Sequence, residues 1–170
     1  PAQAADLDPV AVKKAIDGGI AFLKRGQKNG LWPDYANIAG GSSPHGVTAL
    51  CTLALLNCGV PPDDVVVAAS IAHLRRLTPD DLRTVYGVSL HAMVLCQADP
   101  QKHLLQIARD VEWLEKAQIK SGRNKGCWSY FVEPGGGDNS NAQFAVLALY
   151  EAERAGVSVK QRTWELAYEY

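Results

Sequence analysis

Apolar residues recur at helical spacing along the whole chain, and two kinds of helical segment alternate. The first kind carries an apolar stripe on one side only. Its first example starts at Asp8-Pro9, a capping carboxylate followed by proline, and ends near Gln27. The second kind is apolar nearly all round, as in the segment from Ser43-Pro44 to Gly59. Such a helix is buried on several sides, so we expect one-sided outer helices to cover fully apolar inner helices.

The alternation repeats along the chain. Three inner segments, 48–55, 88–95 and 142–149, align with one another and start 40 and 54 residues apart. A helical hairpin repeated at this length is typical of solenoids and toroids. A further one-sided helix follows Ser158. The pattern predicts an all-α chain: a partial α/α toroid of about three outer–inner hairpins plus the first helix of a fourth, in one domain, 1–170.

One motif occurs twice at the end of an outer helix. Residues 22–32 contain Gln27 followed by Gly30-Leu31-Trp32, and residues 113–128 contain Gln118 followed, after a longer insert, by Gly126-Cys127-Trp128. Each copy is followed by a glycine-rich loop and an inner helix. The motif therefore sets the register of the repeat.

This motif resembles the QW motif of squalene–hopene cyclases and of the related prenyltransferase/squalene oxidase repeat proteins. The resemblance covers nearly the whole chain and implies an α/α toroid, usually of six hairpins. It also implies that Gln27, Trp32, Gln118 and Trp128 are structural, because the glutamine bonds free backbone groups at helix ends and the tryptophan packs there. Only half a toroid is present, so we expect a fragment or half-ring, completed by a missing C-terminal half or by a homodimer.

Composition excludes several classes of protein. With 17 basic and 18 acidic residues the net charge is −1, and scattered Lys and Arg offer no nucleic-acid surface. No apolar run approaches the roughly 20 residues that span a bilayer. The four cysteines form no C-x-x-C pair, so we expect them to pack in the core without a metal. The start, Pro1-Ala2-Gln3-Ala4, is similar to the end of a secretory signal and favours export; an ordinary Ala-rich terminus in a cytoplasmic protein remains the alternative.

In this architecture a cavity is lined by the inner helices and the loops that precede them. Ser42 and Ser43 lie in the first such loop. Helix N-termini there attract anions. We expect His73 and His103, on outer helices, to be solvated. The candidate ligand-binding residues are His45, Tyr86, His91, Tyr130, Asp138, Asn139 and Asn141.

Three kinds of catalysis find only partial support. A proton-initiated cyclase needs the family's paired aspartates, and 137–142 keeps only Asp138. A zinc prenyltransferase needs an aspartate two residues before Cys127, where Lys125 stands. A glycosidase-like pair, Glu133 and Asp138, lies in a loop where acids are usually solvated.

We therefore predict a non-catalytic scaffold or interaction domain without cofactors. Its concave inner-helix face would bind an apolar or isoprenoid-like ligand. The alternative is an isoprenoid cyclase or prenyltransferase whose catalytic acids lie outside this segment.

Overall fold

The computed structural model describes residues 8–33, 45–132 and 136–170. The described part is all-α, as predicted, and contains no β-strand. No helix in these ranges is long and apolar enough to cross a membrane. The helices are α1 (Pro9–Gly26), α2 (Gly46–Asn57), α3 (Val65–Leu74), α4 (Pro79–Leu82), α5 (Val85–Ala98), α6 (Pro100–Ala117), α7 (Asn139–Arg154) and α8 (Gln161–Glu169).

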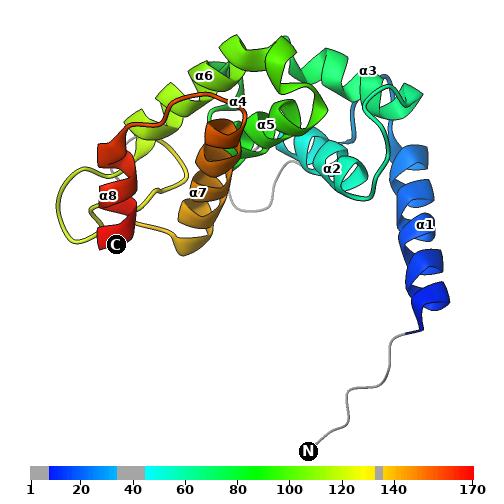
Figure 1. Ribbon diagram of the computed structural model, residues 1–170, viewed down its shortest axis with the longest axis horizontal. Helices are drawn as coiled ribbons and strands as arrows, with labels where there is room; N and C mark the ends of the chain where they lie inside the picture. Colours follow the sequence, from blue (N-terminus) through cyan, green and yellow to red (C-terminus); the bar gives the residue numbers. More distant parts are fainter. Residues whose placement is uncertain (1–7, 34–44, 133–135) are drawn as a thin grey trace, which may run out of the picture.

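The helices form an arch of two rows (Figure 1). Helices α3 and α6 run along its outer rim, while α2, α5 and α7 lie beneath them on the inner side. Helix α5 is central and packs against α2, α3, α6 and α7. Helix α1 extends away from the body at one end, and α8 lies at the other.

Side chains at the helix starts set the boundaries. Asp8, Asp64, Asp99 and Asp138 each accept a hydrogen bond from a backbone N–H in the first turn of α1, α3, α6 and α7. Such a cap satisfies an amide that has no partner within its own helix.

The segment after Thr78 differs from its predicted form. Thr78-Pro79 is a capping signal ahead of the inner segment 88–95, but the helix that starts there, α4, ends after one turn. Arg83 takes a left-handed backbone conformation, with φ of 61°. Thr84 then caps α5 by accepting from the Gly87 amide. The break turns α5 to run through the centre of the core.

Burial separates α1 from the other outer helices. In α3 and α6 the apolar stripe is largely buried, with Val67 and Ile107 both at 0% exposure. In α1 the corresponding side chains are open: Val12 is 40% exposed and Ile16 is 45% exposed. The described part of α1 packs against the inner helix α2, and its last turn reaches the start of α3 through the ion pair of Lys24 with Asp64 at 2.6 Å.

Candidate functional site

The two Gln…Gly-x-Trp segments make the same contact through their tryptophans. The Trp32 indole Nε1–H donates to the Leu23 carbonyl at 2.8 Å, and the Trp128 indole donates to the Leu114 carbonyl at 2.7 Å. Each carbonyl belongs to the residue four positions before the glutamine of its motif. Both indoles are buried. Each gives a hydrogen-bond partner to a carbonyl near the C-terminus of an outer helix, where the helix itself supplies none.

The two glutamines link their own helix end to the next outer helix. The Gln27 amide donates to the Val66 carbonyl in α3 at 2.6 Å, and the Gln118 amide donates to the Thr163 carbonyl in α8 at 3.0 Å. Gln118 also donates to the carbonyl of Gly126, at 3.0 Å. These bonds hold consecutive outer helices together.

The motif glycines complete the link. Gly30 and Gly126 have φ of 84° and 95°. A Cβ at Gly30 would lie 2.7 Å from the Ala69 carbonyl oxygen, and one at Gly126 would lie 1.9 Å from that of Leu166. Ala69 and Leu166 each stand three residues after the carbonyl that accepts from the glutamine. Both motifs therefore hold the next outer helix in the same register, at contacts that only glycine permits.

His91 lies in the core. Its Nε2–H donates to the Leu74 carbonyl at the end of α3, at 3.0 Å, and its Nδ1 lies 2.6 Å from Asp110 Oδ2. Both side chains are 1% exposed. Burial lowers the pKa of His91, but the charge and the hydrogen bond of Asp110 outweigh this effect, so the pKa of His91 is raised. Burial raises the pKa of Asp110, because it disfavours the charged carboxylate. The pair joins α3, α5 and α6.

Four of the predicted residues meet before α7. Tyr86 donates from its hydroxyl to Ser140, which donates to Asp138 Oδ1, each at 2.5 Å. Asn141 also donates to that oxygen from its backbone and its side chain, at 2.8 and 3.0 Å. The Tyr130 ring lies 5.9 Å from the Tyr86 ring. The hydrogen bonds from Ser140 and Asn141 lower the pKa of Asp138, so the carboxylate is ionised at neutral pH and caps α7.

The other two predicted residues lie apart from this cluster. Asn139 accepts from the Tyr170 hydroxyl at 2.6 Å. His45 Nδ1 lies 3.2 Å from His73 Nε2, and burial followed by the His45 charge lowers the pKa of His73. Ser42, Ser43 and Glu133 fall outside the described residues.

A groove of about 410 Å³ lies at the C-terminal ends of the three inner helices. The sequence placed a cavity at their N-terminal ends, and a separate hollow beside the start of α7 is lined by Asn139, Trp128 and Tyr170. Apolar side chains from each helix line the groove, and polar side chains lie at the last turns. The apolar residues are Leu53, Met93 and Leu147; the polar ones are Asn57, Gln97, Glu151 and Arg154. Glu151 and Arg154 are joined by an ion pair of 3.2 Å.

Several buried polar residues were missed from the sequence. His103 was expected to be solvated and is 4% exposed. Asp110 and Glu115 on α6 are 0% and 6% exposed and were not among the predicted residues. Glu115 accepts from the Lys160 backbone N–H at 2.7 Å, which ties α8 to α6. Helical spacing carries no signal for such pairs, because their partners lie on other helices.

Metal ligands do not cluster in the described part of the chain. Within it, no group of three or more His, Cys, Asp or Glu side chains is placed to hold an ion. The four cysteines are free thiols, and Cys127 is buried with its Sγ–H donating to the Trp128 carbonyl at 3.3 Å.

Comparison with known proteins yields no relationship. No family model matches the chain. No curated protein and no solved structure matches it either.

Proposed function

We propose that this chain is a non-catalytic helical-repeat domain that binds an apolar, isoprenoid-like ligand on the inner face of its arch. The observation that carries the proposal is the groove to which α2, α5 and α7 each contribute an apolar side chain. Leu147 at its edge is 44% exposed, and Leu50, one turn before Leu53, is 50% exposed. Exposed apolar surface gathered in a hollow is typical of a binding site.

The ends of the groove favour a neutral polar head on the ligand. Glu151 and Arg154 neutralise one another, while Asn57 and Gln97 offer amides that both donate and accept. An isoprenoid alcohol combines an apolar chain with one hydroxyl, and it would place the chain over Leu53, Met93 and Leu147. A diphosphate would instead meet the partial negative charge of three helix C-termini.

The site chemistry supports binding without catalysis. Protonating an alkene requires a neutral, strongly acidic carboxylic acid, and Asp138 is an ionised helix cap. The side-chain N–H groups of the motif residues donate to backbone carbonyls; these residues are Gln27, Gln118, Trp32 and Trp128.

The second candidate is an isoprenoid cyclase or prenyltransferase whose acids lie in another segment or chain. The paired Gln…Gly-x-Trp links favour it, because the resemblance rests on that motif. Incubation of the full-length gene product with farnesyl diphosphate or squalene separates the two candidates, because a catalytic acid in another segment is then present. Product formation would establish the enzyme and remove the non-catalytic proposal.

The binding proposal is tested on purified protein. Organic extraction and mass spectrometry identify an apolar molecule that remains bound through purification. Farnesol is then titrated into delipidated protein and followed by methyl NMR, with saturable shifts expected for Leu53, Met93 and Leu147. If no molecule is retained and farnesol leaves these methyl signals in place, the proposal fails.

A further inference from the structure

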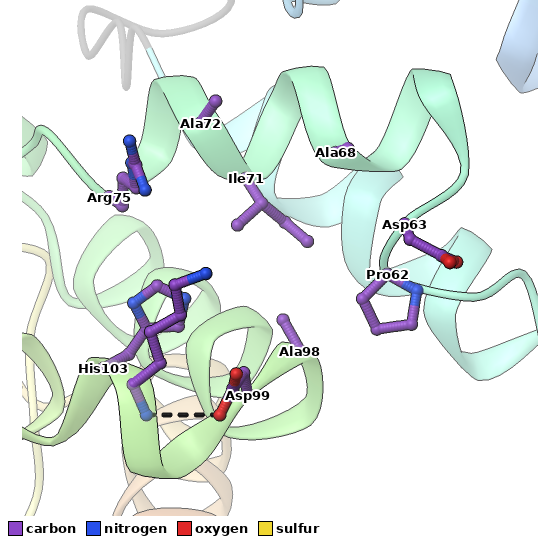
Figure 2. Close-up of a pocket in the computed structure, with 10 residues that line it drawn as sticks. Pro62, Asp63, Ala68, Ile71, Ala72, Arg75, Ala98, Asp99 and His103 are labelled. Carbon is purple, nitrogen blue, oxygen red and sulfur yellow. Dashed lines mark hydrogen bonds between the residues drawn. The ribbon is translucent and has the colours of Figure 1, made fainter.

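A further hollow lies between α3 and the start of α6. It holds about 350 Å³, within the size range of small-molecule sites. Its apolar wall is built from Pro62, Ile71 and three alanines, Ala68, Ala72 and Ala98 (Figure 2). The small alanine side chains leave the space open.

The charges around this hollow are separated. Arg75 and His103 lie at one end of it in Figure 2, and Asp63 lies at the other. Lys102 also lines the hollow. Asp99 is occupied in capping α6, where it accepts from the Lys102 backbone N–H at 3.2 Å. Within residues 8–33, 45–132 and 136–170, neither Arg75 nor the Lys102 ammonium forms an ion pair.

Within the described residues His103 forms no hydrogen bond, and its ring nitrogens stay accessible to the hollow that it lines. The residue is 4% exposed and lines the hollow, and its side chain projects from the start of α6 toward α3 (Figure 2). An imidazole carries a donor and an acceptor, and both are available to a group that enters the hollow. Elsewhere in this fold the buried histidine, His91, uses both ring nitrogens. His103 instead leaves its ring nitrogens free to bond to a group inside the hollow.

The electrostatics near His103 favour a negative group. Burial lowers the pKa of His103, Asp99 acts in the opposite direction, and the charges of Lys102 and Arg75 lower it further. The imidazole is therefore neutral at neutral pH and has one N–H to donate. An anion bound beside it would accept that N–H and the donors of the two cations.

We propose that this hollow binds a small organic carboxylate with a short apolar tail. The carboxylate would lie between Arg75 and Lys102 and accept a hydrogen bond from His103. The tail would extend over Ile71 and the alanines. This site is separate from the groove of the inner helices and does not depend on the function proposed for it.

The test is a titration of the full chain, followed by ¹H–¹⁵N NMR, with hexanoate, hexanamide and acetate. Hexanoate is expected to give saturable shifts around Ile71 and His103. Hexanamide, which has the same tail without the charge, should bind at least about tenfold more weakly. Acetate should also bind at least about tenfold more weakly, because it lacks the tail. Bound hexanoate should raise the pKa of the His103 ring, since an added negative charge stabilises the imidazolium.

Two exposed variants locate the site without disturbing the core. Arg75→Gln and Lys102→Gln should each weaken hexanoate binding about tenfold, the loss of one charge-assisted hydrogen bond. Arg76→Gln removes the neighbouring exposed cation, which does not line the hollow, and should leave the affinity unchanged. Absence of saturable hexanoate shifts overturns the proposal, as does equal binding of hexanamide. If Arg75→Gln and Arg76→Gln weakened hexanoate binding equally, net charge alone would account for the attraction, and the proposal would again be overturned.

Discussion

His91 and Asp110 form the most deeply buried ionisable pair of the described chain, at 2.6 Å between Nδ1 and Oδ2. Asp110 Oδ1 is buried and has no hydrogen-bond partner there. The buried Asp110 carboxylate therefore depends on His91 for its hydrogen bond and for an opposite charge. Replacing one partner leaves the other unpaired in the core, which costs about 3–5 kcal/mol.

Stability should depend on pH through this pair. The pKa of His91 is raised above its ordinary value of 6.5. The stabilisation is complete below that value and is lost as the pH rises through the higher pKa of the folded state. We expect the free energy of unfolding, measured in urea from pH 6 to 9, to fall with rising pH. His91→Gln should be less stable and should lack this part of the slope; an unchanged slope in the variant would assign the effect to other groups.

Gly126 is constrained by both its backbone and its neighbour. Gly126→Ala places a Cβ 1.9 Å from the Leu166 carbonyl oxygen at φ of 95°. Gly156→Ala is the matched control, since its φ is 96° but its Cβ would meet nothing within 4 Å. The control should lose about 1–2 kcal/mol from the left-handed conformation alone. Gly126→Ala should lose about 1–3 kcal/mol more from overpacking. Equal losses in urea unfolding would mean that the contact with α8 is unimportant.

At the scale of elements, Gln118 and Glu115 fasten α8 to α6. Gln118 is 2% exposed and donates to the Gly126 carbonyl in its own motif and to the Thr163 carbonyl in α8. Gln118→Met keeps the side-chain length but leaves the Thr163 and Gly126 carbonyls without this donor.

We expect Gln118→Met to cost about 2 kcal/mol, because buried acceptors lose their partner. Amide hydrogen exchange of 161–169 should accelerate more than that of α5. Gln101→Met makes the same change at an exposed site on α6 and should leave exchange in α8 as it was. If Gln118→Met accelerated amide exchange equally in all helices, the result would argue against a local link between α6 and α8.

The sequence predicts elements well where one helix carries all the information. The alternation of one-sided and fully apolar segments predicted the outer and inner rows, and Asp8 caps α1 as its position indicated. The one-turn helix α4 was missed, because Thr78 and Asp81 form a complete capping box within a segment whose apolar pattern continues past it.

The sites were harder to predict, because they depend on contacts between helices. The groove uses the last turns of α2, α5 and α7, where Asn57, Gln97 and Arg154 look like ordinary exposed residues. Asp110 and His103 share α6 with charged neighbours, and α6 packs against α5, where His91 bonds to Asp110. No spacing rule within one helix encodes such packing.

At the scale of the whole molecule, α1 leaves apolar side chains open along an entire helix. Phe22 is 69% exposed in addition to Val12 and Ile16. A homodimer was expected from the incomplete repeat, and a second copy would cover such a stripe. Multi-angle light scattering should then show a mass that rises with concentration, and Ile16→Lys should suppress the rise. A constant monomer mass for the unmodified chain would contradict pairing.

The inner face of the arch carries the central claim, and paired leucine substitutions test it most directly. Leu147 lines the groove on α7 and is 44% exposed, whereas Leu105 on outer helix α6 is 76% exposed and does not line it. The measurement is the dissociation constant of farnesol for the unmodified chain, Leu147→Gln and Leu105→Gln. We predict that Leu147→Gln weakens binding about tenfold, the loss of roughly 1.5 kcal/mol of apolar burial, while Leu105→Gln has no effect. Equal affinities of the two variants would contradict a binding site on the inner helices.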